Sequence, residues 1–420
     1  MRKSLSMVLA VLMVLSLLMV SGGGAMASGE SVCLKFYLWD QNMLDGVVRR
    51  QALVTAANPN ITFENTVLPW GDYWTKLQTS LPSSEGPDMF QCEANHTSEY
   101  GSLGFIEPLN GYIQRDSFDM SVYTEGSKKL FTNTEGVVYG IPLNYDNAGL
   151  YYNKTLFDEA GLEYPKDGMS FAEFRDLANK LTKRDGETVT QWGAVAGPWP
   201  QNAVYGLILG NGVYPYGEDC QSSNFTDPRF KETMQFLYDM TFVDKVMPDG
   251  AEQVSIPGNQ MFMNNMLAMY IAGPSNLKEF SETMGDTFDI AVPPMNKKQA
   301  ISIMGMDLCI SANTKYKEAA WETLKVFGSE EAAAIEAEMM CPGFTSGKSV
   351  WEANYPDYHM YAFTAAAELG QAVIPKYKMG TVDNYFQEML STVFSNEKSV
   401  DDALSETDAK IKAVFDELKK

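Results

Sequence analysis

Histidine and cysteine are scarce in this chain, and their scarcity argues against metal chemistry. The 420 residues contain two histidines, His96 and His359, and five cysteines. The sequence has no C-x-x-C pair and no H-E-x-x-H motif, which are the spacings typical of structural and catalytic zinc sites. A chain of this length can also build its core without disulfides. We therefore expect neither a metal nor a cofactor.

Long hydrophobic runs are equally scarce, because the only one lies at the N-terminus. Arg2 and Lys3 precede an almost wholly apolar stretch at residues 5–20, and three glycines and an A-M-A sequence follow it. This order is that of a secretory signal peptide, which we assign to residues 1–27. The apolar run is shorter than the ~18–20 residues of a membrane span. We expect a protein secreted across the cytoplasmic membrane, periplasmic or cell-surface associated.

Cys33 is the one cysteine placed where exported proteins can carry a lipid anchor. Glu30, Ser31 and Val32 precede it, whereas a lipidation signal needs small residues there. Whether the mature chain is tethered stays open.

Positive charge is in short supply. Lysine and arginine total 32 against 54 acidic residues, so the formal net charge is −22, and loss of Arg2 and Lys3 with the signal makes it −24. Such a surface repels nucleic acid and anionic lipid headgroups. The balance favours a soluble monomer with a neutral ligand.

The first part of the chain alternates between extended and helical patterns. The predicted order is strand 32–38, helix 45–57, strand 61–68, helix 73–81 and strand 88–93. This order predicts parallel strands with helical crossovers. Ligands of such sheets bind beyond the carboxyl ends of the strands, which here are residues 39–42, 69–71 and 91–95.

Alternation resumes after residue 150. Ser170 and Glu173 form a capping box that opens a helix, and the Gly/Pro/Trp-rich residues 192–200 are interpreted as a loop. Residues 301–310 are interpreted as one long buried strand, and residues 400–418 as a last helix. Without repeats or a low-complexity linker, two α/β bodies joined by more than one crossing fit best.

One crossing is expected at Asn144, Tyr145, Asp146 and Asn147. Pro142 disfavours a helix before this segment, and the residues after it favour a strand. We expect the crossing to expose these four side chains, which suit a polyhydroxylated ligand.

Several further pieces occur in a characteristic order. They are residues 73–81 with 86–90, 104–109, 139–142 through 151–161, 211–212, 319–321, 329–332 and 399–404. Together, behind a signal peptide, they make the chain resemble the extracellular solute-binding proteins of ABC transporters, of the carbohydrate-binding type related to maltose-binding protein.

The resemblance implies an α/β, two-lobed fold of the periplasmic-binding-protein type II class with a hinged ligand cleft. The N-terminal lobe would comprise residues 28–143 and 298–343, and the C-terminal lobe residues 144–297 and 344–420. The partners would be a carbohydrate ligand and the permease subunits of an ABC transporter, with no nucleic acid.

A sugar offers apolar C–H faces to aromatic rings and hydroxyls to carboxylates and amides. Candidate ligand-binding residues are Trp39, Asp40, Asn42, Glu93, Asn95, Asn144, Tyr145, Asp146, Trp199, Gly273, Asn276, Asp307, Asn384 and Tyr385. Asn384 and Tyr385 are included on the resemblance, and Trp70 ranks below the other loop tryptophans. Asp307 lies in an apolar run, so it must find hydrogen-bond donors or face a wet cleft.

Two other functions stay open. A secreted glycosidase would need two carboxylates at a defined separation, and a sugar sensor would signal through a membrane partner without transport. The sequence has no G-x-S-x-G motif, and residues 343–349 depart from a phosphate-binding loop by one position. The preferred interpretation is a non-enzymatic binding protein.

Overall fold

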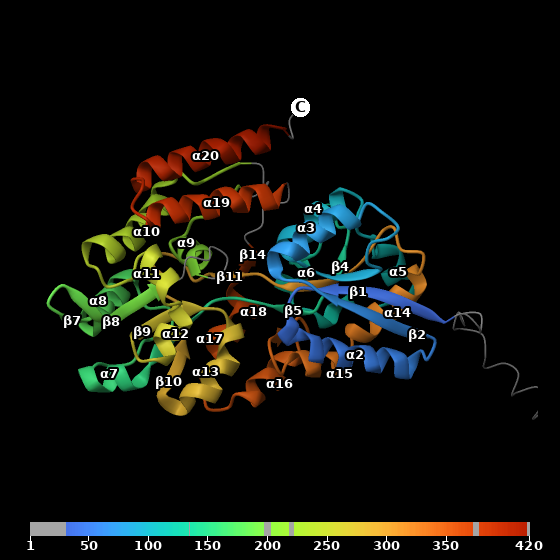
Figure 1. The fold of residues 1–420 in the computed structure, drawn as a ribbon, viewed down its shortest axis with the longest axis horizontal. Coiled ribbons are helices and arrows are strands. Elements are labelled where there is room, and N and C mark those ends of the chain that lie inside the picture. Colours follow the sequence, from blue (N-terminus) through green and yellow to red (C-terminus); the bar gives the residue numbers. More distant parts are fainter. Residues whose placement is uncertain (1–30, 134, 197–202, 218–221, 373–377, 418–420) are drawn as a thin grey trace, which may run out of the picture.

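The computed structural model describes residues 31–133, 135–196, 203–217, 222–372 and 378–417, and these residues form two lobes (Figure 1). The predicted signal peptide lies outside the described residues. Within them, no helix combines the length and the apolar character that crossing a membrane requires.

The first lobe is built on a five-stranded sheet of order β2-β1-β3-β12-β4. Its strands are β1 (Val32–Leu38), β2 (Ile61–Val67), β3 (Met89–Glu93), β4 (Gly140–Pro142) and β12 (Met306–Ile310). β1 pairs in parallel with both β2 and β3, as predicted, whereas β12 is antiparallel to β3 and β4.

Helices cover both faces of this sheet because its strands alternate between two apolar clusters. Leu34 and Phe36 join one cluster with α2 (Leu44–Ala57) and α14 (Lys317–Phe327). Tyr37 joins the other with α3 (Trp70–Ser80) and α4 (Ala94–Ser102). The second pair of helices faces the site described below.

The second lobe is built on a sheet of order β10-β6-β9-β8-β7. Its strands are β6 (Gly149–Asn153), β7 (Lys183–Asp185), β8 (Thr188–Ala196), β9 (Leu267–Ala272) and β10 (Phe288–Ala291). One face packs on α8 (Phe171–Leu181), α10 (Pro228–Tyr238), α19 (Met379–Phe394) and α20 (Val400–Asp416). The other packs on α12 (Gly258–Met263), α13 (Leu277–Met284) and α17 (Tyr361–Thr364).

The remaining helices are shorter or peripheral. They are α5 (Asn110–Asp116), α6 (Glu125–Leu130), α7 (Lys154–Ala160), α9 (Tyr205–Gly210), α11 (Gly250–Ser255), α15 (Glu330–Glu336), α16 (Gly347–Asn354) and α18 (Ala366–Leu369). The predicted capping box at Ser170 and Glu173 is present and opens α8.

Short strands join the lobes. β5 (Asn144–Tyr145) pairs with β13 (Cys341–Pro342), and β11 (Ile301–Ile303) pairs with β14 (Gly370–Ala372). Asp146 and Met304 exchange two backbone hydrogen bonds of 2.8 Å, so two crossings of the chain are paired with each other. In Figure 1, β5, β11 and β14 lie between the two halves of the molecule.

Residues 301–310 were expected to form one long strand, but they form two. They divide at Gly305, with β11 at the crossing and β12 in the first sheet. A side chain at Gly305 would stand 2.6 Å from the Asn144 carbonyl oxygen. The glycine allows two backbones to approach closely where the chain passes between sheets.

The expected loop at residues 192–200 is also corrected, because β8 continues through Trp192 to Ala196. A β-carbon at Gly193 would lie 1.9 Å from the Ala178 carbonyl oxygen of α8. This glycine serves close packing between strand and helix rather than a turn. Residues 197–200 lie outside the described part.

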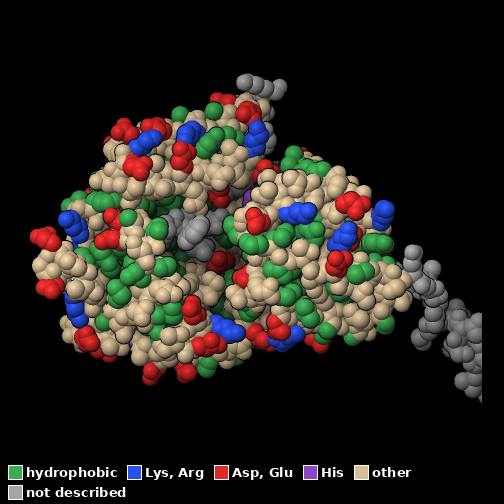
Figure 2. Space-filling model, viewed as in Figure 1, with side chains coloured by type: hydrophobic (Ala, Val, Ile, Leu, Met, Phe, Trp, Pro, Cys, Tyr) green, Lys and Arg blue, Asp and Glu red, His purple; other side chains and the backbone are tan. Residues whose placement is uncertain are grey.

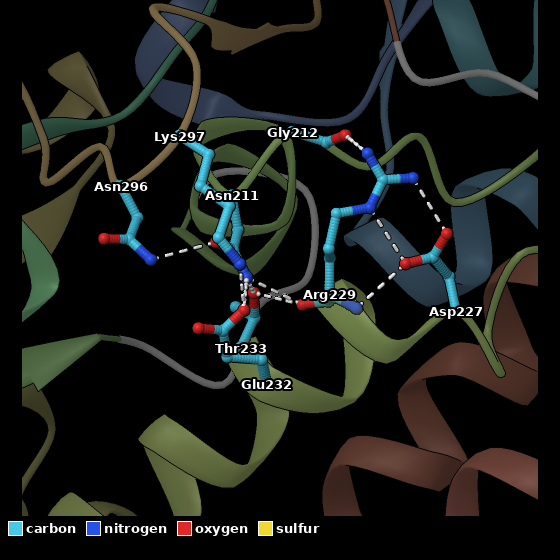
Figure 3. Close-up of polar contacts among 8 residues, drawn as sticks. All are labelled: Asn211, Gly212, Asp227, Arg229, Glu232, Thr233, Asn296 and Lys297. Carbon is cyan, nitrogen blue, oxygen red and sulfur yellow. Dashed lines mark hydrogen bonds and ion pairs between the residues drawn. The ribbon is translucent and has the colours of Figure 1, made fainter.

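Asn211 and Gly212 were among the segments that carry the family resemblance. They hold the chain between α9 and α10 in place through hydrogen bonds (Figure 3). The fully buried Asn211 amide donates to the Arg229 carbonyl oxygen at 2.8 Å, and its oxygen accepts from Asn296 at 3.0 Å. The Gly210 carbonyl oxygen accepts from the backbone N–H groups of residues 296–298 at 2.8–3.0 Å. This network holds residues 296–298, which lead into β11 at the crossing between the lobes, against the second lobe.

Candidate ligand-binding cleft

A cavity of about 720 Å³ lies between α3, the junction of β3 with α4, and α19. Its walls are Trp70, Gly71, Trp74, Gln78, Glu93, Asn95, His96, Glu99, Gly380, Thr381, Asp383, Asn384 and Gln387. Figure 2 shows a hollow between the two lobes with acidic side chains visible inside it. The volume is in the range of small-molecule sites.

Aromatic rings form the wall that the first lobe contributes. Trp70 and Trp74 meet edge to face with centroids 5.2 Å apart, and His96 lies against Trp74 at 3.9 Å. Trp39 packs behind them, 5.4 Å from Trp70 and 5.7 Å from Trp74. Trp70 remains 45% exposed, so part of its ring is open to solvent.

The parallel sheet positions this wall. Pro69 follows β2 and precedes the first residue of α3, Trp70, so the helix begins at the carboxyl edge of the sheet. The buried Tyr73 hydroxyl donates to the Gln91 carbonyl oxygen at 2.5 Å and fixes α3 against β3. α4 begins directly after β3, which places its first turns at the same edge.

Buried polar atoms at this edge have no partner among the described residues. Asn95 is 2% exposed, and its Oδ1 accepts no hydrogen bond. The Glu93 Oε2, the Trp74 Nε1 and the His96 Nδ1 are also buried and without a hydrogen bond. Because such groups cost free energy when unpaired, acceptors and a donor on one wall indicate a site for a polar ligand.

Burial controls the charge of the wall. It raises the pKa of Glu93 from its ordinary 4.5 to about 8, and the nearby carboxylates of Asp383, Asp146 and Asp307 act in the same direction. Burial also lowers the pKa of His96 to about 4. At neutral pH the histidine is uncharged and Glu93 is largely protonated.

The second lobe contributes one face of α19. Val382, Phe386 and Met389 of this helix pack into the core, so Asp383, Asn384 and Gln387 lie toward the cavity.

Two hydrogen bonds among the described residues link this helix to the first lobe. Asp383 accepts one from Asn95 at 3.1 Å, and it also accepts one from Tyr205 of its own lobe at 3.4 Å. The Gly380 N–H donates to Glu99 at 3.4 Å. Polar groups of both lobes thus meet at the cavity.

Three of the predicted site residues line this cavity, namely Glu93, Asn95 and Asn384. Trp199 lies outside the described residues. The others are placed elsewhere: Trp39, Asp40, Asn42, Asn144, Tyr145, Asp146, Gly273, Asn276, Asp307 and Tyr385.

The expectation that residues 144–147 form an exposed segment is corrected. Asn144 is fully buried, donates to Glu336 at 2.5 Å and accepts from the Met306 N–H at 3.2 Å. Glu336 in turn pairs with the buried Arg50 at 2.7 Å. Tyr145 is 2% exposed within the hydrophobic core. The Asn144 side chain is covered by its tertiary partners and Tyr145 by the surrounding core, so neither reaches solvent.

Asp307 has found donors inside the protein. It is fully buried and accepts from Thr97 at 3.0 and 3.1 Å and from the Cys309 thiol at 3.3 Å. A β-carbon at Gly140 would stand 1.8 Å from its Oδ2, so glycine is needed there. Burial raises the pKa of Asp307 to about 7.

Cys92 joins Asp307 and Cys309 in a buried group whose polar atoms lie within 4.8 Å of one another. Burial raises the pKa of both thiols. Protonated thiols make hydrogen bonds rather than bind metal ions, so we interpret this group as a hydrogen-bonded part of the core.

The remaining candidates make local contacts. Asp40 accepts from the Asn42 N–H at 2.8 Å and begins a 3-10 turn. Asn276 donates to the Gly273 carbonyl oxygen at 3.2 Å. Tyr385 packs against the core of the second lobe, with Lys410 located 5.2 Å from its ring centroid.

Most of the aromatic wall and of the α19 face were not among the predicted site residues. Trp74, His96 and Glu99 lie in helices, where apolar spacing is usually a sign of the core. The available signal was that their helices begin at the carboxyl ends of strands. The sequence offered no comparable signal for Asp383 and Gln387.

A family model described as "Bacterial extracellular solute-binding protein" matches residues 47–334. The chain belongs to this family. The described fold agrees with solved members of the same two-lobed class: an ABC substrate-binding protein from Listeria monocytogenes in complex with cycloalternan has a TM-score of 0.83 at 22% identity, covering 91% of this chain and 98% of that one.

Other relatives have the same character. The sugar-binding protein MalE of Xanthomonas citri has a TM-score of 0.77 at 20% identity, covering 92% and 98% of the two chains. The diacetylchitobiose-binding protein DasA of Streptomyces coelicolor is 25% identical over 276 residues, 62% of this chain and 61% of its own. These relatives are binding proteins.

Proposed function

We propose that this protein is the extracytoplasmic substrate-binding component of an ABC transporter, which captures a carbohydrate in the cavity between α3, α4 and α19 and delivers it to a membrane permease. The observation that carries the proposal is the wall itself. Two tryptophan rings stand beside buried donors and acceptors that have no partner among the described residues.

The chemistry of this wall suits a sugar. A pyranose can place its C–H face on the exposed part of Trp70 while its hydroxyls donate to Asn95 and accept from Trp74. The protonated form of Glu93 can both donate and accept. Sugars and oligosaccharides also appear in the names of several relatives.

We divide the lobes as the sequence analysis did, at residues 143/144, 297/298 and 343/344. Export by a signal peptide at residues 1–27, a monomeric state and hand-over to permease subunits complete the proposal. Ligand binding would strengthen the few contacts between α4 and α19 and close the lobes about the paired crossings.

Thermal shift against a library of saccharides is the first test. A ligand that binds only the folded protein raises Tm by mass action, and calorimetry then gives Kd and stoichiometry. We expect at least one saccharide to bind at one site per chain. If amino acids, peptides or anions raise Tm and no saccharide does, the carbohydrate assignment is wrong.

Turnover and closure provide two further tests. The tightest saccharide should be recovered intact after prolonged incubation with fresh protein, and release of reducing ends would favour the glycosidase alternative. Small-angle scattering should show a smaller radius of gyration at saturation. An unchanged radius would contradict closure.

A further inference from the structure

We propose that the preferred saccharide carries a protonated amino group, bound between Glu93, Glu99 and the Asn95 side-chain oxygen. This inference rests on the proposed function, because it takes the ligand to be a carbohydrate. It changes the expectation of a neutral ligand, which was based on the net charge of the whole chain.

The charges of the cavity are one-sided. Among the described residues, the walls contain the carboxyl groups of Glu93, Glu99 and Asp383 but neither lysine nor arginine. His96 adds no positive charge near neutral pH, because burial lowers its pKa to about 4. Asp146 also acts on Glu93 through its negative charge. Any positive charge in the cavity would therefore be stabilised.

Closure around a neutral sugar would make this imbalance costly. Carboxylates that lose water need a counter-charge or strong donors. A neutral ligand supplies hydroxyls only, whereas an ammonium group supplies a positive charge and three N–H donors. The pKa of Glu93 is raised first by burial and then by the nearby carboxylates, and a ligand ammonium beside it would favour its ionised form.

The unpartnered atoms have the polarity that an ammonium group needs. The Asn95 Oδ1 and the Glu93 Oε2 are both acceptors, both buried and both without a hydrogen bond among the described residues. Asn95 uses one of its two N–H donors on Asp383 at 3.1 Å, whereas its oxygen has no partner among the described residues. The carboxylate of Glu99, one helical turn further along α4, accepts a long 3.4 Å hydrogen bond from the Gly380 N–H.

The aromatic wall favours an organic cation over a bare metal ion. The exposed part of the Trp70 ring can stack on a sugar face, and its negative face attracts a nearby ammonium group. A divalent metal ion would instead need six or more oxygen ligands or retained waters. The rings would contribute nothing to its coordination.

A matched set of ligands tests the proposal directly. Glucose, galactose and mannose, and β-1,4-linked glucose oligosaccharides, each exist with a hydroxyl, an acetamide or a free amine at carbon 2. Calorimetry at neutral pH should show the amine binding about ten- to a hundredfold more tightly than its two counterparts, as for a charge-assisted contact.

The outcomes separate this inference from the proposed function. If the hydroxyl or acetamide members bind as tightly as the amines, the inference is wrong and carbohydrate binding stands. If no member and no other saccharide binds, both are wrong. Calcium or magnesium binding in place of the amine would also overturn the inference.

Two isosteric variants locate the contact. Glu93→Gln and Glu99→Gln should each weaken amine binding by about tenfold more than they weaken binding of the hydroxyl counterpart. Glu388→Gln is the matched control, since it removes one acid from the exposed side of α19 and should leave both affinities unchanged. Equal losses for amine and hydroxyl ligands would mean that the carboxylates only shape the wall, which would contradict the proposal.

Discussion

The crossing between the lobes and the wall of the cavity are both rich in amides, acids and aromatic rings, but the buried asparagine of each is paired differently. At the crossing, the Asn144 side chain is bonded on both sides, to Glu336 and to the Met306 N–H. On the wall, the Asn95 Oδ1 and the Glu93 Oε2 are buried without a partner among the described residues. A buried unpaired group costs about 1–3 kcal/mol. The paired Asn144 side chain therefore has a structural role, whereas the unpaired atoms of Asn95 and Glu93, which line the cavity, are candidates for ligand contact.

The largest effect expected from this comparison is on folding. Tyr145→Ala should lower the free energy of unfolding of the ligand-free protein by about 3–5 kcal/mol, because a fully enclosed aromatic side chain is lost. Urea denaturation measures this change. Where the variant is folded, its ligand affinity should change by less than about threefold. A large loss of affinity without loss of stability would place Tyr145 in the binding site after all.

The buried Asp307 should make the stability of the protein depend on pH. Its pKa is raised from 3.8 to about 7 in the folded state by burial, so the stability it contributes is full below pH ~4 and is lost as the pH rises through 7.

Relative to the native chain, Asp307→Asn should therefore gain ~2–4 kcal/mol in the free energy of unfolding between pH 4 and pH 8. Urea titrations of both proteins across that range give the difference. A difference that stays constant with pH would show that the carboxyl group does not titrate in this window.

Trp70→Ala tests the opposite side of the comparison. The side chain is 45% exposed, so stability should change by less than about 1 kcal/mol, whereas ligand affinity should fall about thirtyfold, or about 2 kcal/mol. Tyr316→Ala is the control, because that ring is 41% exposed on the same lobe and does not line the cavity. A thirtyfold loss in the control would show a non-specific effect.

The smallest loss of affinity is expected for a substitution on α19, the wall that the second lobe contributes. Gln387→Ala should weaken binding by about fivefold, or about 1 kcal/mol, as for one neutral hydrogen bond. Calorimetry with the same ligand allows the loss of affinity to be compared with that of Trp70→Ala. A larger loss than in Trp70→Ala would reverse the order of the two walls.

Much of the fold could be predicted because its signals are local. The strand 32–38 and the helix opened by Ser170 are visible in the apolar spacing and the capping residues, and both are present. The split at Gly305 could not be predicted, because both halves of that run are buried and apolar. Which sheet each half joins depends on partners distant in sequence.

The site was harder to predict for the same reason. Glu93 and Asn95 follow a strand at its carboxyl end, where topology alone points to a ligand. Tyr145 and Asp307 have the right chemistry, but tertiary partners enclose them. Trp74 has core spacing on its helix and nevertheless lines the cavity. Residue type and position along a strand were visible in the sequence, whereas pairing across the fold was not.

The place of β12 has a consequence for how the chain is made. β12 lies between β3 and β4 in the first sheet, although the strands of the second sheet precede it in the sequence. At synthesis rates of about 5–20 residues per second, roughly ten to forty seconds separate the emergence of β3 from that of β12. During that interval the first lobe lacks the strand that joins β3 to β4 and cannot close its core. The nascent protein thus stays unfolded longest in its N-terminal part, the part that a translocation channel would receive first.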